Sequence, residues 1–477
     1  MNISVFKWAG LGFGIAGLVG CANVPKDAGF GEVQKVVATR TGHLVQWRGN
    51  TAADAAVDAA VFSALQQGLT ADEAVQIALL NNLNLQATYQ ELGVAQANLV
   101  QAGLLKNPTL SFERRLPGQA AVLDVFADFL DLFFIPLRKR VAGAEFEAAK
   151  LRVADAVLMT AAQTRQAFYT LQGAEQMVEM RRSVAQATAA SAEAAQRLRE
   201  AGNITLLAFR EEQKLAARAK LDLARAEAEV IEDRERLNVL MGLWGTSTDW
   251  KIASRLPALP ATELSAQGLQ SLAVSQRLDL GVAREEVEVA AQSLGLSRAS
   301  RFVPNVNIGA HFEREADGVE SVGPSIELPI PIFDQGQAVV ARGGALLRQS
   351  QLRYAALAVE IRSEVRTAYS RMIAARDRVE YHQREVLPLA AQVVEQTQLQ
   401  YNAMQTGVFQ LLQAKQAQIE AGREYIETLR EYWVARSELE RAVGGRLRAS
   451  ESIRPATQPT GPMPTTDESH SQHYHGG

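Results

Sequence analysis

The 477-residue chain contains a single cysteine, Cys21, so a disulfide within the chain and a zinc site built on cysteines are both excluded. It also lacks an excess of positive charge, since 49 basic and 53 acidic residues are interspersed and give a formal net charge of −4. Without a basic patch, nucleic acid is not an expected partner. Beyond the N-terminus no apolar run reaches the length of a membrane-spanning helix.

Motifs of catalysis are missing as well. No glycine-rich phosphate loop follows a strand, and no Ser-His-Asp order is suggested. His43, His311 and His382 have no neighbouring set of metal ligands in the sequence. We therefore expect that the chain is not an enzyme and that it binds no cofactor.

Proline is absent from Leu137 to Arg255, and the stretch is rich in the helix formers Ala, Leu, Glu, Arg and Gln. A helix over residues 137–201 would be roughly 95 Å long at 1.5 Å per residue. Helices of this length occur in coiled coils and membrane spans, and the scattered charges exclude the second. The sequence therefore predicts long helices that pack against each other.

The chain repeats itself with a period of about 200 residues, which indicates a duplicated domain and not a stacked array. Thr70 and Glu73 form a capping box that opens a helix, and Ser265 is the expected cap of the equivalent helix. Asn107-Pro108 corresponds to Pro304-Asn305, each just before an alternating segment. We expect a first repeat over residues 69–256 and a second repeat over residues 264–446.

Each repeat should contain two strands followed by two long helices. In the first repeat the predicted strands are residues 107–116 and 122–136, and the predicted helices are residues 137–201 and 204–242. In the second repeat the strands are residues 304–315 and 323–333, and the helices are residues 335–403 and 408–444, with a kink at Pro388. The apolar spacing in residues 122–134 suits a helix at least as well as a strand, so both remain open there.

The segment Asn305–Glu313 alternates strictly. The apolar side consists of Val306, Ile308, Ala310 and Phe312, and the polar side includes Asn307, His311 and Glu313. Ser325–Phe333 alternates in the same way. A strand of about ten residues can cross a bilayer in a tilted barrel, with its apolar side toward lipid and its polar side toward a lumen. A small soluble sheet that caps a helical bundle is the alternative.

Four strands per chain are too few to close a barrel. Because open sheet edges are not tolerated in lipid, several chains would have to share one barrel. Three copies would give a barrel of twelve strands, an even number within the known range.

The N-terminus has the features of a targeting segment. Lys7 precedes the apolar, glycine-containing stretch Trp8–Val19, and Leu18-Val19-Gly20-Cys21 resembles the processing site of bacterial lipoproteins. Residues 1–20 would then be a signal peptide and Cys21 the lipid-bearing (palmitate) residue, followed by a lead-in over residues 21–68. Ala22 after the cysteine favours the outer membrane. A buried free cysteine is the alternative.

The chain resembles the TolC-type outer-membrane efflux proteins in five features taken together. These are the lipoprotein site, the duplication, the capped helix at Thr70, Asn107-Pro108 before a strand, and the long hairpins. The chain is similar in particular to the lipid-anchored members that serve heavy-metal exporters of the RND type. The resemblance covers nearly the whole chain after Leu69. It implies a mainly α fold with a small membrane β-barrel. Four strands per chain would form a twelve-strand barrel in a homotrimer, and the duplicated helical hairpins would form an α-barrel in the periplasm.

The resemblance implies a channel that performs no chemistry and passes heavy-metal cations or drugs to the exterior. Its partners would be a periplasmic adaptor (a membrane fusion protein) and an inner-membrane RND-type pump. The helical turns near residues 199–205 and 404–409 would meet the adaptor or form the aperture. The residues assigned to these tips are Gly202, Leu206, Leu207, Arg210, Tyr401, Gly407, Gln410, Leu411 and Gln413.

Within the tips, Gly202 and Gly407 are expected to adopt the positive φ of a turn. Four leucines should pack just inside the turns: Leu206, Leu207, Leu411 and Leu412. The acidic positions that are common at the aperture of the family are Gln410, Gln413 and Ala208 here. Gating by carboxylates is therefore not implied for this chain.

Two other interpretations belong to different classes, a periplasmic coiled-coil adaptor and a structural lipoprotein. An adaptor should carry one helical hairpin flanked by β-rich domains, whereas this chain has two hairpins and few strands. The tail, residues 455–477, is rich in Pro, Thr and Ser, which predicts disorder. Its His470, His473 and His475 are candidate metal ligands, with an unselected polar tail as the alternative.

Overall fold

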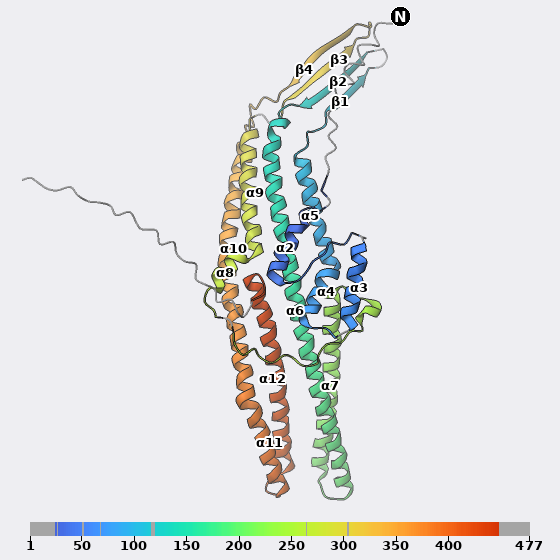
Figure 1. Cartoon of the computed structure of the whole chain (residues 1–477), viewed down its shortest axis with the longest axis vertical. Helices are drawn as coiled ribbons and strands as arrows, with labels where there is room; N and C mark the ends of the chain where they lie inside the picture. Colours follow the sequence, from blue (N-terminus) through green and yellow to red (C-terminus); the bar gives the residue numbers. More distant parts are fainter. Residues whose placement is uncertain are drawn as a thin grey trace, which may run out of the picture.

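The computed structural model describes residues 24–25, 27–49, 52–66, 68–115, 120–263, 265–302 and 305–447. The predicted signal peptide, Cys21 with its predicted lipid, and the tail with its three histidines lie outside these residues. The described chain is elongated: a sheet lies at one end and two helical hairpins reach the other (Figure 1). Within the described residues, no helix is both long enough and apolar enough to cross a membrane.

The same order of elements occurs twice. The first half comprises α4 (Ala71–Asn81), α5 (Leu83–Ala102), β1 (Thr109–Arg114), β2 (Ala121–Asp128), α6 (Asp131–Glu200) and α7 (Leu206–Met241). The second half comprises α8 (Leu269–Gln276), α9 (Leu278–Ser300), β3 (Asn307–Arg314), β4 (Glu320–Glu327), α10 (Gln337–Tyr381), the π-helical turn η3 (His382–Val386), α11 (Leu387–Asn402) and α12 (Val408–Val443). The lead-in adds α2 (Phe30–Thr41) and α3 (Ala52–Gln66), and the short 3₁₀ turn η2 (Gly245–Thr248) follows α7.

The first helix of each half begins differently. Thr70 and Glu73 form the predicted capping box, with the Glu73 amide 3.3 Å from Thr70 Oγ1 and the Thr70 amide 2.8 Å from Glu73 Oε2. The prediction for Ser265 is wrong, because α8 begins after Gly268, which has a left-handed backbone. The Ser265 hydroxyl instead accepts a hydrogen bond from the Gln267 amide at 3.2 Å.

Residues 122–134, whose apolar spacing fits both a strand and a helix, contain the end of a strand and the beginning of a helix. Strand β2 ends at Asp128, and α6 begins at Asp131, before the predicted helix start at residue 137. Pro136 therefore lies inside α6, where it costs one backbone hydrogen bond near the beginning of the helix. Asp131 is buried in this first turn and accepts hydrogen bonds from Arg138 and from the Lys106 amide. These contacts favour an early start of the helix.

The second hairpin ends sooner than its alternating sequence predicts. Strand β4 stops at Glu327, so the strand predicted to reach Phe333 is wrong over its last six residues. Pro329 and Pro331 have no amide hydrogen for a strand ladder, which explains why pairing stops there. Pro324 is tolerated within β4 because β4 lies at the edge of the sheet.

The long helix of the second half is interrupted just before Pro388. Residues 382–386 form a π-helical turn between α10 and α11. Proline at this position lacks the amide that would continue the ladder to Arg384, and a π turn is a common way to accommodate such a loss. The interruption expected from Pro388 is therefore present as a local change of helix type.

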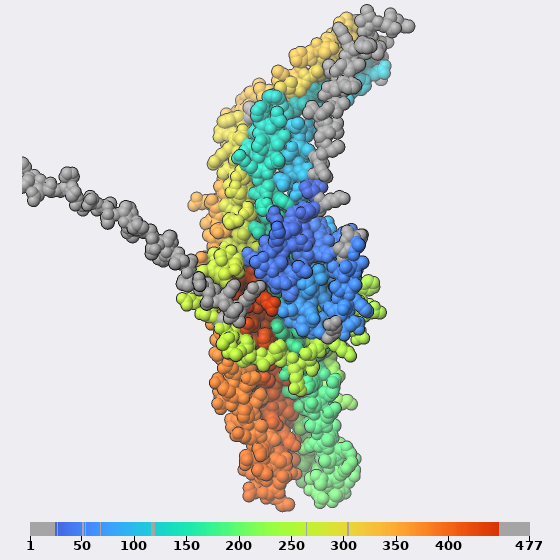
Figure 2. All heavy atoms as spheres, in the orientation of Figure 1, coloured from blue at the N-terminus to red at the C-terminus, as the bar shows by residue number. Residues whose placement is uncertain are grey.

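The core consists of three clusters of buried side chains, two of which include the middle of α6. Side chains of α2, α5 and α6 form one buried cluster, those of α3, α4, α6 and α7 a second, and those of α8, α10 and α12 a third. The lead-in and the linker between the halves gather around the middle of the molecule, where Figure 2 shows them in blue and yellow-green. The sheet and the hairpin ends thus project from a central packed region.

Candidate functional site

The four strands form one antiparallel sheet in the order β1-β2-β3-β4. The pairing of β2 with β3 joins the two halves, with Asp124 opposite His311 and Val125 opposite Ala310. Each half thus supplies one hairpin, and β1 and β4 form the edges. Among the described residues, neither edge strand has a partner on its outer side.

One side of this sheet is apolar. The residues on that side are Leu110, Phe112, Leu123, Val125, Ala127, Ile308, Ala310, Phe312, Val322, Pro324 and Ile326. Most of the large side chains among them are exposed, including Leu110, Phe112, Val322 and Ile326. At the hairpin end the apolar rows stop at a charged row that contains Arg114, Arg314 and Glu320.

The opposite side of the sheet is largely polar. Its residues include Ser111, Glu113, Asp124, Asn307, His311, Glu313, Ser325 and Glu327. His311 Nδ1 lies 2.6 Å from Asp124 Oδ1, and His311 Nε2 lies 3.5 Å from Glu313 Oε2. His311 therefore does have carboxylate neighbours, contrary to the sequence-based expectation. Even so, no group of His, Cys, Asp and Glu side chains within the described part of the chain is arranged to hold a metal ion.

The two hairpin turns at the far end share one backbone geometry. After α6, Gly202 has φ +78° and the Asn203 amide bonds to the Leu198 carbonyl at 2.8 Å. After α11, Met404 has φ +60° and the Gln405 amide bonds to the Gln400 carbonyl at 2.9 Å. The expectation for Gly202 is confirmed.

The expectation for Gly407 is wrong. Its φ is −88°, and it occupies the N-cap position of α12, as Thr205 does for α7. Met404 takes the place of Gly202 instead. Residue type alone equates Gly407 with Gly202, although Gly407 lies three residues further along the equivalent turn.

The leucines beside the turns are buried in the second hairpin and exposed in the first. Leu411 and Leu412 are buried, as expected. Leu206 and Leu207 are exposed, with 52% and 60% of their surface accessible, so the prediction that they pack inside the turn is wrong for the single chain. Leu206 and Leu207 thus form an adjacent exposed apolar pair at the first tip, which has no counterpart beside the second turn.

The remaining tip residues are polar or partly exposed. Arg210 donates a hydrogen bond to Gln213 Oε1 at 2.7 Å. Tyr401 is half-buried, whereas Gln410 and Gln413 are exposed. The described residues of the two tips contain no carboxylate between Ala201 and Arg210 or between Tyr401 and Gln413.

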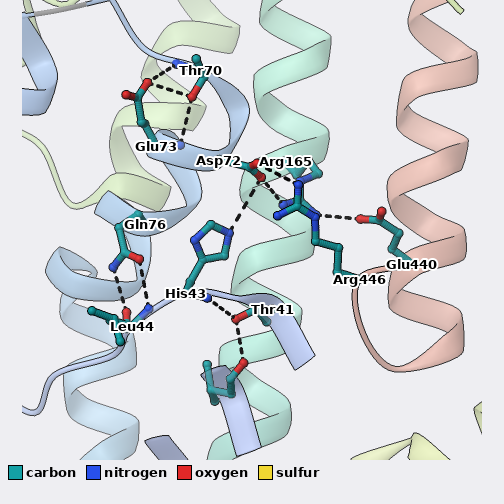
Figure 3. A network of polar contacts seen from close by, with 11 residues as sticks. Thr41, His43, Leu44, Thr70, Asp72, Glu73, Gln76, Arg165, Glu440 and Arg446 are labelled. Carbon is teal, nitrogen blue, oxygen red and sulfur yellow. Dashed lines mark hydrogen bonds and ion pairs between the residues drawn. The ribbon is translucent and has the colours of Figure 1, made fainter. Parts of the chain in front are cut away.

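A partly buried network of charges ties the middle of the molecule together (Figure 3). The Arg165 guanidinium of α6 lies 2.7 Å from Asp72 Oδ1 and 2.7 Å from Glu440 Oε2, which belong to α4 and α12. Arg446 reaches Asp72 Oδ2 at 3.1 Å, and His43 Nε2 lies 3.9 Å from Asp72 Oδ1. The network therefore joins the lead-in to both halves of the chain.

Burial and charge act against each other on the pKa values of this network. Burial raises the pKa of Glu440 although Arg165 and Arg436 favour its carboxylate form. Burial would also raise the pKa of Asp72, but Arg165 and Arg446 outweigh it and hold this pKa below its usual value. Burial lowers the pKa of His43, whose Nε2 has no hydrogen-bond partner among the described residues. No local pattern in the sequence predicts this network, since its members come from distant segments.

The long helices lie side by side in a layer, and within the described part of the chain no further long helix covers either of its two edges. Toward the sheet α6 packs against α5 and α9, and α9 packs against α10; toward the tips α6 packs against α7 and α12, and α12 packs against α10 and α11. Strand β1, α5 and α7 therefore border one edge, and β4, α10 and α11 border the other. Both edges carry exposed apolar side chains, among them Leu221, Ile231 and Val239 on α7 and Val359, Leu389 and Val393 on α10 and α11.

Comparison with known proteins gives consistent matches. Residues 269–445 match the model of the outer membrane efflux protein family. The cobalt-zinc-cadmium resistance protein CzcC of Cupriavidus metallidurans is 24% identical over 393 residues, which cover 79% of this chain and 90% of that protein.

Solved structures with the same fold include CusC and the CmeC outer membrane channel of Campylobacter jejuni. CusC superposes with a TM-score of 0.66 at 16% identity and covers 81% of this chain and 94% of its own. CmeC superposes with a TM-score of 0.68 at 16% identity and covers 80% of this chain and 87% of its own. The predicted fold class, a mainly helical chain with duplicated long hairpins and one four-stranded sheet, is confirmed.

Proposed function

We propose that this chain, a TolC-type outer-membrane efflux protein by its fold and by the family match of its second half, is the exit channel of a tripartite efflux system. The resemblance predicted from the sequence is thereby confirmed. In this role the chain opens a path from the periplasm to the exterior. It performs no chemistry, in keeping with a match to a family of efflux proteins.

The observation that carries the proposal is a two-sided sheet with two free edges. One chain cannot close a barrel with four strands, and unpaired edges are costly in lipid. Pairing β1 of one copy with β4 of the next satisfies both edges and repeats around a ring. Three copies give twelve strands, with the apolar side toward lipid and the side that carries His311 toward the lumen.

The ring of three copies that closes the sheet into a barrel would also close the helical layer. The α5 and α7 edge of one copy would meet the α10 and α11 edge of the next, which would cover the exposed leucine, isoleucine and valine side chains of both edges. A ring of such layers is an α-barrel continuous with the β-barrel. It would form a tunnel on the periplasmic side of the outer membrane.

The lipid anchor is part of the proposal. Cleavage after residue 20 and acylation of Cys21 would attach the lead-in to the membrane that holds the barrel. Because the sheet and the lipid would then enter the same bilayer, the anchor should assist assembly without being needed to hold the finished barrel in place.

At the far end, the tips would contact a periplasmic adaptor that connects the channel to an inner-membrane RND-type pump. The exposed pair Leu206 and Leu207 supports this, because an apolar surface at a helix end needs a partner. The docking or aperture residues we assign are Gly202, Leu206, Leu207, Arg210, Tyr401, Gly407, Gln410, Leu411 and Gln413. Met404, exposed at the outermost part of the second turn, joins this set.

Heavy-metal cations are the cargo we assign, since the relative CzcC is described as a cobalt-zinc-cadmium resistance protein. Selection of the cargo would rest with the pump and not with this chain. His470, His473 and His475 of the tail would at most collect cations near the channel. Drugs are the competing cargo class, and metal tolerance of cells that lack the chain distinguishes the two.

Reconstitution tests the channel against a soluble adaptor. The full-length protein with Cys21→Ser should still require detergent and should form trimers that conduct ions across a planar bilayer. An adaptor or a structural lipoprotein would become water-soluble once its lipid is removed and would conduct no ions. That result would refute the channel.

A further inference from the structure

The apolar side of the sheet continues onto the first turns of α6. Phe129 follows β2 in the same alternation as Val125 and Ala127, so its side chain belongs to the apolar side. Its ring contacts the Phe133 ring edge-on, with 5.6 Å between the centroids. Both rings are exposed. This contact shows which side of α6 faces the same way as the apolar side of the sheet.

Two exposed cations lie about two helical turns further along α6. Arg140 follows Phe133 by seven residues, which brings it back to the same face of the helix, whereas Lys139 is rotated by roughly 120° and lies beside Gly103 at the end of α5. Neither has an ion-pair partner among the described residues. The neighbouring cations differ: Arg138 is bound to Asp131, and Lys106 lies 3.3 Å from Asp128 Oδ2.

A second copy of the chain is not positioned to cover this face. Strand β2 lies between β1 and β3, and α6 lies between α5 and α9, so both are interior elements of their layers. Neighbouring copies meet the edges of those layers. The lumen is excluded as well, since Phe129 and Phe133 lie on the side opposite His311. What remains is the outer surface, at the junction between sheet and helices.

We propose that Lys139 and Arg140 bind the anionic headgroups of phospholipids in the membrane leaflet that faces the helical part of the chain. The inference rests on the proposed function, because it takes the apolar side of the sheet to lie in a bilayer. Phe129 and Phe133 then lie at the acyl boundary, and the two long cationic side chains extend from there to the phosphate level. An anionic leaflet attracts such cations, whereas a zwitterionic one does so weakly.

A similar pair precedes β3. The Arg301 guanidinium lies 4.0 Å from the centroid of the exposed Phe302 ring. Arg301 also packs against Gly336, where an added Cβ would lie 2.8 Å from Arg301 Cβ, so this pair is at the beginning of α10. Each half of the chain thus has an aromatic ring and a free or ring-stacked cation at the level where the sheet meets the helices.

The test uses the full-length protein in bilayers of phosphatidylcholine that contain a small fraction of spin-labelled phosphatidylglycerol or spin-labelled phosphatidylcholine. The wild-type protein should immobilise the anionic probe preferentially. The variant Lys139→Gln/Arg140→Gln should lower the relative association constant of that probe about tenfold, and added salt should do the same. The control Lys220→Gln/Lys251→Gln removes two exposed lysines from the helical part, far from the sheet, and should leave the preference intact.

Two results would overturn the inference: no preference for phosphatidylglycerol in the wild type, or a preference that survives in Lys139→Gln/Arg140→Gln. Competition with millimolar inorganic phosphate should not displace the lipid probe, and displacement would assign the site to free phosphate. Planar-bilayer conductance of the same preparations separates this inference from the proposed function. A conducting channel without lipid preference refutes only the headgroup site, whereas failure to insert refutes the channel.

Discussion

Asp124 of β2 and His311 of β3 face each other across the two halves of the chain, with 2.6 Å between Oδ1 and Nδ1. They are 187 residues apart in sequence. The pair lies on the polar side of the sheet, while the next pair along the strands, Val125 and Ala310, lies on the apolar side. One strand pairing thus fixes the register of the duplicated halves and separates a polar side of the sheet from an apolar side.

Replacing Ile308 with Arg should impair insertion of the barrel. The side chain is exposed on the apolar side, where an arginine in the middle of a bilayer costs about 2–4 kcal/mol. The yield of membrane-inserted trimers, measured after vesicle flotation, should fall. The matched variant His311→Arg should insert normally, because its cation remains beside the carboxylates of Asp124 and Glu313. Equal yields from both variants would mean that this sheet does not lie in a membrane.

The two sides of the sheet could be predicted because alternation is local and survives without knowledge of the partner strands. The partner of His311 could not be predicted, because Asp124 lies in a stretch whose apolar spacing fits a helix as well as a strand. The end of β4 shows a different failure: the alternation of residues 325–333 was correct as a pattern, but Pro329 and Pro331 remove the hydrogen bonds that a strand needs.

The tips and the central network were less accessible to sequence reasoning. Comparing the turns by residue type equates Gly407 with Gly202, but the residue equivalent to Gly202 is Met404. Only the backbone hydrogen bonds show which residues of the two turns correspond. The network of Asp72, Arg165 and Glu440 depends on which faces of three distant helices meet. Charges at helical spacing usually belong to solvated faces, so nothing in their pattern marks the few that are buried.

Deleting residues 455–477 should leave trimer formation intact. The last described helix ends at Val443 and is terminated by Gly444, which has a left-handed backbone, so every element proposed to form the barrel lies upstream. Chemical cross-linking should give the same trimer yield as the full chain. If His470, His473 and His475 collect cations, the deletion should modestly lower metal tolerance of the cells. Loss of the trimer would show that the tail has a structural role.

Replacing Arg165 with Met should destabilise the chain by about 3 kcal/mol, because it leaves the buried Glu440 carboxylate without its main cation. Unfolding by denaturant, followed by tryptophan fluorescence, measures the loss. The double variant Arg165→Met/Glu440→Leu should recover much of it, since no buried charge remains unpaired. A double variant as unstable as the single one would show that Arg165 acts through packing alone.

The same variant should respond to pH in a defined direction. Burial already raises the pKa of Glu440, and removing Arg165 takes away the largest influence that lowers it. A carboxyl group whose pKa is higher in the folded than in the unfolded chain destabilises the fold above its unfolded value of about 4.3 and less so as the pH falls. The deficit of Arg165→Met relative to wild type should therefore shrink between pH 7 and pH 5. A deficit that is constant over this range would argue against an ionised Glu440.

Replacing Leu206 and Leu207 with Ser should weaken binding of the adaptor without disrupting the trimer. Both side chains are exposed beside the first turn, whereas Leu411 and Leu412 beside the second are buried. Burying an exposed leucine contributes roughly 1.5–3 kcal/mol, so losing two at a contact should lower adaptor affinity at least tenfold. Surface plasmon resonance with the adaptor measures this, and Lys220→Ser on the same helix is the control. If cross-linking instead shows that the trimer is lost, the two leucines contact a neighbouring copy and the adaptor surface lies elsewhere on the tips.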